Sequence, residues 1–200
     1  MAPFTDRYVK CVTTPSRTQL LDAGEQLFYT RGITRTGVDA VAEAAGVTKP
    51  TLYAQFGRKS QLVAAVLERR HERRRAELDA WLEPFPPAEQ PLEVLAWLRS
   101  WYAAERNERG CAFLNAAAEL PDPEDPGRIA VQREKSWLLE RLVGLCHAAG
   151  LTQPETLGSQ LLLLVDGLAG RAVVGGPAAA VTAADHAYRA AQVLIAAARS

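Results

Sequence analysis

The sequence lacks the features that would place it outside the cell or in a membrane. Its three cysteines, Cys11, Cys111 and Cys146, are odd in number and far apart, so no disulfide scaffold is expected. The N-terminus has no apolar stretch of the signal-peptide type. Apolar runs such as Leu161 to Val165 are far shorter than the roughly 20 residues that cross a bilayer. We therefore expect a cytoplasmic protein with no membrane partner.

The sequence also lacks a net charge, because 23 lysines and arginines balance 23 aspartates and glutamates. The balance is uneven along the chain. Residues 1–75 carry 13 basic and 7 acidic side chains, whereas residues 76–200 carry 10 basic and 16 acidic ones. The first part is therefore suited to approach phosphate, and the second is not.

Strand patterns are missing as well, since no segment alternates apolar and polar residues over a sustained length. Alanine, leucine, glutamate and arginine dominate, and these residues favour helix. Apolar spacing, capping residues and glycine stops predict an all-α chain of about nine helices. These helices are expected near residues 16–31, 36–45, 49–55, 59–83, 92–107, 111–120, 127–149, 154–174 and, after the turn formed by Gly175, Gly176 and Pro177, 178–199.

The predicted helix 59–83 has apolar residues at both ends and the polar stretch ERRHERRRAE between them. A helix with this pattern is expected to link two separate cores and to expose its middle to water. We place a domain boundary near Arg70 to Arg75.

Residues 38–56 predict two short helices separated by the turn Gly46-Val47-Thr48. This is the arrangement of a helix-turn-helix, whose second helix lies in the DNA major groove. The second helix would expose hydroxyls, an amide and a cation, which contact phosphates and base edges. Spacing alone does not distinguish this motif from an ordinary helical hairpin with polar outer residues. The exposed side chains would be Thr48, Lys49, Thr51, Tyr53 and Gln55.

Three stretches occur in order between about Ser16 and Leu67: AGEQLFYTRGI, then T-x-V-x-x-V-A-x-x-A-G-V-T-K-x-T-L-Y-x-x-F, then K-x-x-L. They resemble the AcrR-like helix-turn-helix head of the TetR family of transcriptional regulators. The resemblance covers about a quarter of the chain. It implies a three-helix head, a fourth helix that links it to a ligand-binding body, and a homodimer that represses transcription from a palindromic operator.

The resemblance assigns further DNA contacts by position. Thr36, at the cap of the second helix, Tyr53, and Lys59, which opens the fourth, would contact the DNA backbone. Pro50 would pack on a base or a thymine methyl group. Arg58 replaces the usual serine-type cap and would add a phosphate contact. The predicted DNA-binding set is Thr36, Thr48, Lys49, Pro50, Thr51, Tyr53, Gln55, Arg58 and Lys59. The predicted domains are an N-terminal arm of residues 1–14, expected to be flexible, a DNA-binding domain of residues 15–70, and a ligand-binding and dimerisation domain of residues 71–200.

All four tryptophans lie beyond residue 75. Helix bundles lined by aromatic side chains and a few polar groups often bind small apolar or aromatic molecules, although such aromatics also form ordinary cores. Cys111 and Asn115 are the polar candidates for ligand contact. The predicted pocket is lined by Trp97, Trp101, Tyr102, Cys111, Phe113, Asn115 and Trp137.

The last two predicted helices have broad apolar surfaces, and a helix that is apolar on two sides needs two neighbours. The resemblance assigns the second neighbour to a twin subunit, in an isologous four-helix bundle. The predicted dimer interface consists of Leu157, Leu161, Leu164, Leu168, Ala187, Ala191, Leu194 and Ile195.

Other classes of protein are less well supported. The sequence has no G-x-S-x-G, H-E-x-x-H or G-x-G-x-x-G motif, so we predict no catalytic residue, no metal and no cofactor. Three alternatives stay open: a helical-bundle enzyme, a non-specific DNA-binding protein of the same fold, and an interaction module whose head has lost DNA binding. A steep salt dependence with little sequence preference would mark the second.

Overall fold

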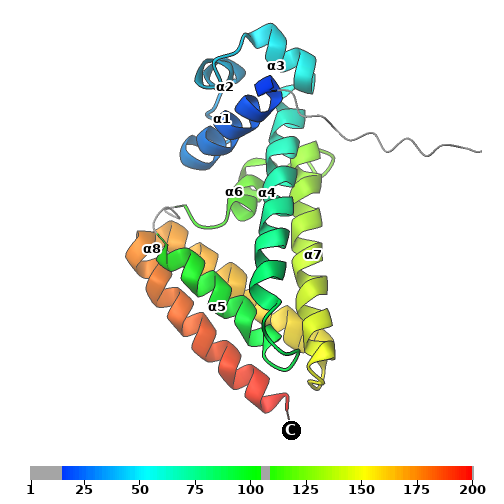
Figure 1. Ribbon diagram of the computed structural model, residues 1–200. Coiled ribbons are helices and arrows are strands. Elements are labelled where there is room, and N and C mark those ends of the chain that lie inside the picture. Colours follow the sequence, from blue (N-terminus) through cyan, green and yellow to red (C-terminus); the bar gives the residue numbers. More distant parts are fainter. Residues whose placement is uncertain (1–14, 105–108, 200) are drawn as a thin grey trace, which may run out of the picture.

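The computed structural model describes residues 15–104 and 109–199, and in these residues it contains eight helices and no strand (Figure 1). The all-α prediction is confirmed. The predicted N-terminal arm lies outside the described residues. The helices are α1 (Pro15–Arg31), α2 (Val38–Ala44), α3 (Lys49–Phe56), α4 (Lys59–Leu82), α5 (Gln90–Ala103), α6 (Ala112–Glu119), α7 (Pro126–Ala148) and α8 (Pro154–Ala197).

Helices α1, α2 and α3 gather at one end of the long helix α4 (Figure 1). We call these three helices, with the first turns of α4, the head. Helix α7 runs beside α4, and α5 and α8 pack at the far end of this pair. We call α5, α7, α8 and the rest of α4 the body. The short helix α6 lies between the head and the body.

Helix α8 is broken at Gly176, whose φ of 71° and ψ of −168° are not helical, and Pro177 follows directly. Only glycine adopts such a backbone at low cost. The two arms return antiparallel, because the Thr152 amide before the first arm donates to the Ala198 carbonyl after the second, at 2.8 Å. The predicted turn between two separate helices is therefore confirmed, and the arms account for the expected ninth helix.

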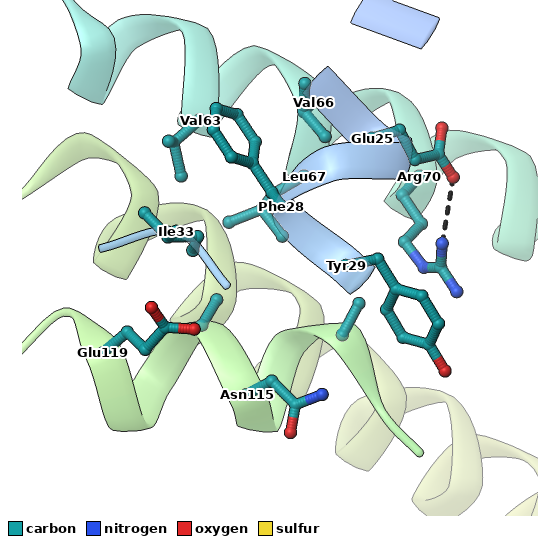
Figure 2. Close-up of a pocket in the computed structure, with 12 residues that line it drawn as sticks. Glu25, Phe28, Tyr29, Ile33, Val63, Val66, Leu67, Arg70, Asn115 and Glu119 are labelled. Carbon is teal, nitrogen blue, oxygen red and sulfur yellow. Dashed lines mark hydrogen bonds and ion pairs between the residues drawn. The ribbon is translucent and has the colours of Figure 1, made fainter. Parts of the chain in front are cut away.

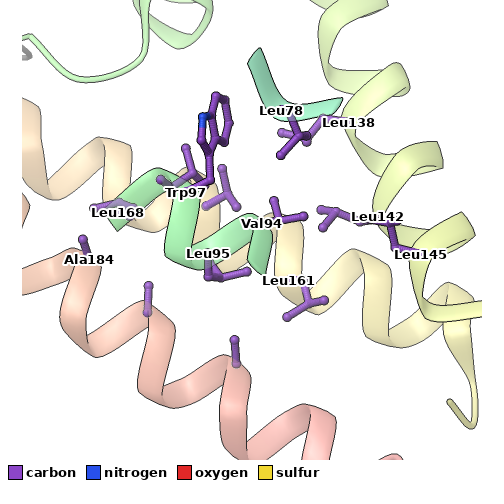
Figure 3. Packing of buried hydrophobic residues seen from close by; sticks show 14 of the residues in the cluster. Leu78, Val94, Leu95, Trp97, Leu138, Leu142, Leu145, Leu161, Leu168 and Ala184 are labelled. Atoms are coloured by element: carbon purple, nitrogen blue, oxygen red, sulfur yellow. The ribbon is translucent and has the colours of Figure 1, made fainter. Parts of the chain in front are cut away.

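Helix α8 is also the one described helix that is long and apolar enough to cross a membrane by length and composition. Its break and its packing give another explanation for this composition. Both arms bury residues against α5 and α7, among them Leu161 of the first arm and Ala184 of the second (Figure 3). An apolar helix is expected wherever a helix contributes to a core.

Two hydrophobic clusters hold the chain together. The body cluster joins α4, α5, α7 and both arms of α8 around leucines such as Leu95 and Leu142 (Figure 3). The head cluster joins α1 to α4, but it also includes the fully buried Phe113 of α6 and Val131 of α7. The prediction that α4 links two cores is thus confirmed. The core of the head, however, is completed by residues from beyond the predicted boundary.

The middle of α4 is not simply exposed to water, contrary to prediction. His71 and Arg74 are only 5% and 9% exposed. The His71 Nδ1 atom forms a short hydrogen bond with the Glu134 carboxylate of α7, and the His71 ring meets Trp137 edge-on. The sequence pattern failed here because burial of a polar residue depends on which distant helices pack against it, and local spacing does not reveal them.

Three arginines of α4 converge on one carboxylate of α1. Glu25 accepts hydrogen bonds from Arg69, Arg70 and Arg73, and Arg69 also pairs with Asp22. Burial raises the pKa of Glu25, but hydrogen bonds from Arg73 and Arg69 and the charge of Arg70 outweigh it and leave this pKa below its ordinary value. The arginine run therefore fixes α4 to α1 and is not a free cationic surface.

Candidate functional site

The turn between α2 and α3 has the geometry of a helix-turn-helix. Helix α2 ends at Ala44 with Ala45 as its C-cap, and Gly46 follows with a φ of 65°, which a glycine adopts without strain. The Val47 amide then donates back to the Ala42 carbonyl at 3.0 Å. Thr48 caps α3, since its hydroxyl accepts from the Thr51 amide at 3.3 Å. The predicted two helices and turn are present.

Helix α3 has one buried and one exposed side. Leu52 and Phe56 point into the head cluster. Thr48, Lys49 and Pro50 are exposed, and Tyr53 is 43% exposed. Thr51 and Gln55 are half-buried, and Arg58 is exposed just beyond the helix. The structure thus brings seven of the predicted DNA-binding side chains to one surface region around α3, backed by a firm core.

Lys49, on this surface, already has a partner within the protein. Its ammonium group lies 2.9 Å from the Asp39 carboxylate of α2, and both side chains are largely exposed. The hydrogen bond that Lys49 donates to the Asp39 carboxylate raises the pKa of Lys49, so this side chain is charged at neutral pH. A phosphate group near α3 would compete with Asp39 for Lys49.

Two predicted DNA contacts need correction. Thr36 is only 1% exposed, and its hydroxyl donates to the Gly32 carbonyl at 2.6 Å. It does not cap α2, whose N-cap is Gly37 with no side-chain hydrogen bond. The Lys59 ammonium donates to the Ile33 carbonyl at 2.6 Å, and burial lowers its pKa. Both side chains are used to hold the turn before α2, because a tight turn leaves carbonyls that need donors.

Arg17 supports the surface around α3 from α1, although it is not among the predicted DNA-binding residues. Its guanidinium donates to the Gln55 carbonyl at 3.1 Å and lies 4.3 Å from the centre of the Phe56 ring. Arg17 thereby holds the C-terminal end of α3 against α1. A cation at a helix C-terminus also interacts favourably with the helix dipole. No sequence signal marked this contact, since 38 residues separate its partners.

Polar contacts join the head to the segment around α6. The Thr34 amide donates to the Glu119 carboxylate at 2.7 Å, and the Tyr29 hydroxyl donates to the Gly110 carbonyl at 3.1 Å. Between these contacts lies a small cavity of about 30 Å³ (Figure 2). It is lined by Phe28 and Val66 from the head side and by Asn115 and Glu119 from α6. A movement of α6 would therefore directly change the contacts that the head makes with it.

Comparisons with known proteins agree with this architecture. A sequence profile described as "Bacterial regulatory proteins, tetR family" matches residues 20–66. A crystal structure of a TetR-family transcriptional regulator from Streptomyces coelicolor superposes with a TM-score of 0.85 and 28% identity, covering 93% of this chain and 97% of that one. The HTH-type transcriptional regulator TtgR of Pseudomonas putida is 44% identical over 57 residues, which are 28% of this chain and 27% of TtgR. ArpR of Pseudomonas putida, described as a probable HTH-type transcriptional regulator, is 28% identical over 166 residues, or 78% of this chain and 79% of ArpR.

The chain belongs to the TetR family of transcriptional regulators. It is a DNA-binding regulator, and α3 is the helix that corresponds to the second helix of its helix-turn-helix. Proteins of this family are not enzymes, which removes the helical-bundle enzyme from the alternatives. Separately, no cluster of three metal-ligating side chains occurs in the residues described.

The structure of this TetR-family body divides the predicted ligand pocket. Trp101, Tyr102 and Cys111 do line one cavity. Asn115 instead borders the cavity between the head and α6, where its amide donates to the Arg109 carbonyl at 2.6 Å. The remaining three, Trp97, Phe113 and Trp137, border neither of these two cavities. The tryptophans and Tyr102 belong to the body cluster or pack against it, whereas Phe113 is buried in the head cluster. These aromatics do not surround a single space, because clusters form from helices that meet only in three dimensions.

Most of the predicted dimer interface is covered by this chain itself. Six of its eight residues are buried inside this single chain: Leu157, Leu161, Leu168, Ala187, Ala191 and Ile195. Leu164 and Leu194 are half-buried. The uncovered apolar side chains of α8 occupy other faces, with Leu163 71%, Val174 80% and Val193 70% exposed. On a helix that is apolar on two sides, spacing does not say which side faces its own chain.

Proposed function

We propose that this TetR-family regulator is a cytoplasmic homodimeric repressor that binds a palindromic operator and leaves it when a small apolar or aromatic molecule enters the body. Residues 15–70 would form the DNA-binding unit and residues 71–200 the ligand-binding and dimerisation unit. The observation that carries the proposal is the exposed polar surface of α3, which includes Thr48, Lys49 and Tyr53 and rests on a buried apolar side. The proposed DNA contacts are Thr48, Lys49, Pro50, Thr51, Tyr53, Gln55 and Arg58.

The polar surface of α3 supports sequence-specific binding. Hydroxyls and an amide exchange hydrogen bonds with base edges, and cations contact phosphates. Arg17 and the buried Phe56 hold α3 in one orientation, so that little ordering is needed on binding. Two such helices in a symmetric dimer would meet successive major grooves about 35 Å apart. A palindromic operator follows from this symmetry.

The uncovered apolar surface of α8 supports the dimer. A groove between its arms is lined by small and apolar residues, and large exposed apolar patches mark interaction sites. Small residues allow two helices to approach closely, and a second copy would present the same surface in return. The proposed contact surface comprises Leu163, Leu164, Gly167, Arg171, Val174, Ala178, Ala179, Thr182, His186 and Ala190.

The dimer is tested by placing a charge in this surface. We expect Leu163→Asp combined with Val174→Asp to yield monomers in size-exclusion chromatography with light scattering, and to weaken operator binding. Ile129→Asp is the matched control, because Ile129 is an exposed apolar residue of α7. Dimers that persist in the double variant would show that another surface pairs the subunits.

Ligand release would act through the helices that join the two units. A ligand that separates α4 from α5 and α7 would tilt α4, which carries the head, and would shift α6, which contacts the head through Glu119. The two heads would then no longer match successive grooves. The free energy of DNA binding would weaken by the difference between the ligand's binding free energies for the DNA-binding and the released arrangement of the heads.

The experiment is a binding titration with the DNA upstream of the chain's own gene, at moderate salt and with excess unrelated DNA. We expect saturable, sequence-selective binding, followed by release with a compound found in a thermal-shift screen. Equal binding to unrelated DNA with a steep salt dependence would favour the alternative of a non-specific DNA-binding protein. Activated rather than reduced transcription would contradict the repressor role.

A further inference from the structure

A cavity in the body is bordered by two polar side chains that have no hydrogen-bond or ion-pair partner among the described residues. Its volume is about 10 Å³, and it lies where α4, α5, α7 and α8 approach one another. Arg74 of α4 and Tyr102 of α5 line it, together with Trp101 and Cys111. Arg74 is 9% and Tyr102 6% exposed. Both polar groups are therefore largely removed from solvent.

Arg74 has no acceptor for its guanidinium. In the described part of the chain, no carboxylate lies within ion-pair distance of it and no oxygen accepts a hydrogen bond from it. Its guanidinium carbon lies 5.4 Å from the Trp97 ring centre and 5.7 Å from that of Trp101. Arginine has five N–H donors and stays charged in proteins. A buried guanidinium without an acceptor is costly, and such groups call for an explanation.

The neighbouring carboxylates do not fill this role, because each already has another partner. Glu134 pairs with His71, and Asp166 of α8 pairs with Lys135 of α7. Both carboxylates border the same cavity. The other charged groups at the cavity thus have hydrogen-bond or ion-pair partners, whereas Arg74 has neither among the residues described.

Tyr102 adds a second donor. Its hydroxyl forms no hydrogen bond with any residue that the structure describes, and its ring meets the Trp101 ring edge-on at 4.9 Å. Burial raises the pKa of Tyr102, so the group remains a neutral O–H donor at physiological pH. Two donors at one cavity favour an acceptor that lies between them, and the charge of the guanidinium favours an anionic one.

We infer that the ligand of this body is an organic acid, whose carboxylate is held by Arg74 and Tyr102 and whose apolar part lies against Trp101. A carboxylate matches the planar fork of a guanidinium and accepts from both donors at once. This inference rests on the proposed function, because it names the chemical class of the releasing ligand.

The size of the cavity connects binding with movement. A volume of about 10 Å³ is close to the space of one water molecule. The apolar part of an acid therefore enters only if α4 and its neighbours move apart. Because α4 also carries the head, the same displacement is suited to change the orientation of α3.

The test uses the full-length protein and three acids: benzoate, naphthoate and decanoate, each with its neutral amide. Tryptophan fluorescence and thermal shift report binding. We expect at least one acid to bind, and to bind roughly 10- to 100-fold more tightly than its amide, which is the effect of a charged hydrogen-bond partner. Arg74→Gln should abolish this preference. Arg75→Gln is the matched control, because Arg75 is the exposed neighbour whose guanidinium lies over Trp137.

A second variant separates ligand binding from structural support. Arg74→Met removes an unpartnered buried charge, so we expect it to fold with an unchanged or higher Tm and to bind no acid. A large fall in Tm would assign Arg74 to structural support and overturn the inference. It would also be overturned if no acid binds the unaltered protein, or if acid and amide bind equally.

Operator binding measured on the same samples distinguishes the two claims. A protein that binds its operator but none of the acids retains the proposed DNA-binding role and refutes the ligand class. A protein that binds an acid without leaving the operator supports the ligand class and contradicts release.

Discussion

The head and the body of this regulator treat buried charge in opposite ways. In the head, Glu25 of α1 accepts from three arginines of α4. In the body, Arg74 lies one residue further along α4 and faces no acceptor among the described residues. The same difference holds for apolar surface, since the head buries its apolar side chains whereas α8 leaves Leu163 and Val174 uncovered.

This difference fits two kinds of partner. DNA has a fixed shape, so a head whose helices α1 and α4 are joined by ion pairs presents its contacts in advance and loses little freedom on binding. A body with unpartnered donors and uncovered apolar surface is incomplete by itself. A ligand and a second subunit would each supply what is missing. Substitutions that change one region at a time test this difference between the head and the body.

The largest effect is expected from Phe113→Ala, which tests how separate the two regions are. Phe113 belongs to α6 but is fully buried in the head cluster. Truncating such a side chain leaves a cavity and should lower the free energy of unfolding by about 3–5 kcal/mol in urea titrations. Phe85→Ala, at a half-buried ring that stacks on Trp81, is the control and should cost much less. If Phe113→Ala is nearly neutral, the head does not depend on α6 for its core.

A smaller loss of stability is expected from Glu25→Gln. This substitution leaves the arginines that pair with Glu25 without its carboxylate, and in this respect the head then resembles the body. Arg73 is partly exposed, so solvent screens its ion pair with Glu25. We therefore expect the free energy of unfolding to fall by about 2 kcal/mol. Glu72→Gln, at an exposed carboxylate of α4, is the control. An equal effect of both substitutions would mean that the shared carboxylate adds nothing.

The pH dependence of stability offers a second view of Glu25. Its pKa is lower in the folded chain than the ordinary value of 4.5, so its stabilising contribution is complete above that value and is lost as pH falls through the folded pKa. Denaturant titrations of the unaltered protein should show this loss of stability at low pH. Titrations of Glu25→Gln should show a smaller loss. Parallel curves would contradict the assignment.

A moderate change in DNA binding is expected at the exposed pair of α2 and α3. Lys49→Ala should weaken operator binding about fivefold, or ~1 kcal/mol, and reduce the slope of the salt dependence by about one. Asp39→Asn removes the competing carboxylate and should strengthen binding. Fluorescence anisotropy at several salt concentrations measures both. If the two substitutions change affinity in the same direction, Lys49 does not move from Asp39 to phosphate.

The smallest effect is expected from Glu119→Gln, at the contact between α6 and the turn before α2. An amide still accepts from the Thr34 amide but without charge, so we expect a loss of about 0.5–1 kcal/mol in stability. The more informative measurement is the ratio of operator affinities with and without a releasing ligand, which should approach unity. An unchanged ratio would exclude this contact as a route between the body and the head.

Much of the head could be predicted from sequence because its determinants are local. Gly46 permits the left-handed turn, Thr48 caps α3, and the spacing of Leu52 and Phe56 sets its buried side. Thr36 and Lys59 were the exceptions. Their side chains serve carbonyls of a tight turn, and a motif gives the position of a residue but not the partner that its side chain meets in the folded chain.

The sequence by itself determined the all-α class, the helix boundaries, the break at Gly176 and the polar outer side of α3, because periodicity, caps and backbone preferences act over a few residues. Only the tertiary structure decided which side of α8 stays uncovered, that Phe113 completes the core of the head, and that Arg74 is buried without an acceptor. These features depend on which distant helices meet. That choice is set by the packing of the whole chain, and not by the pattern of any one helix.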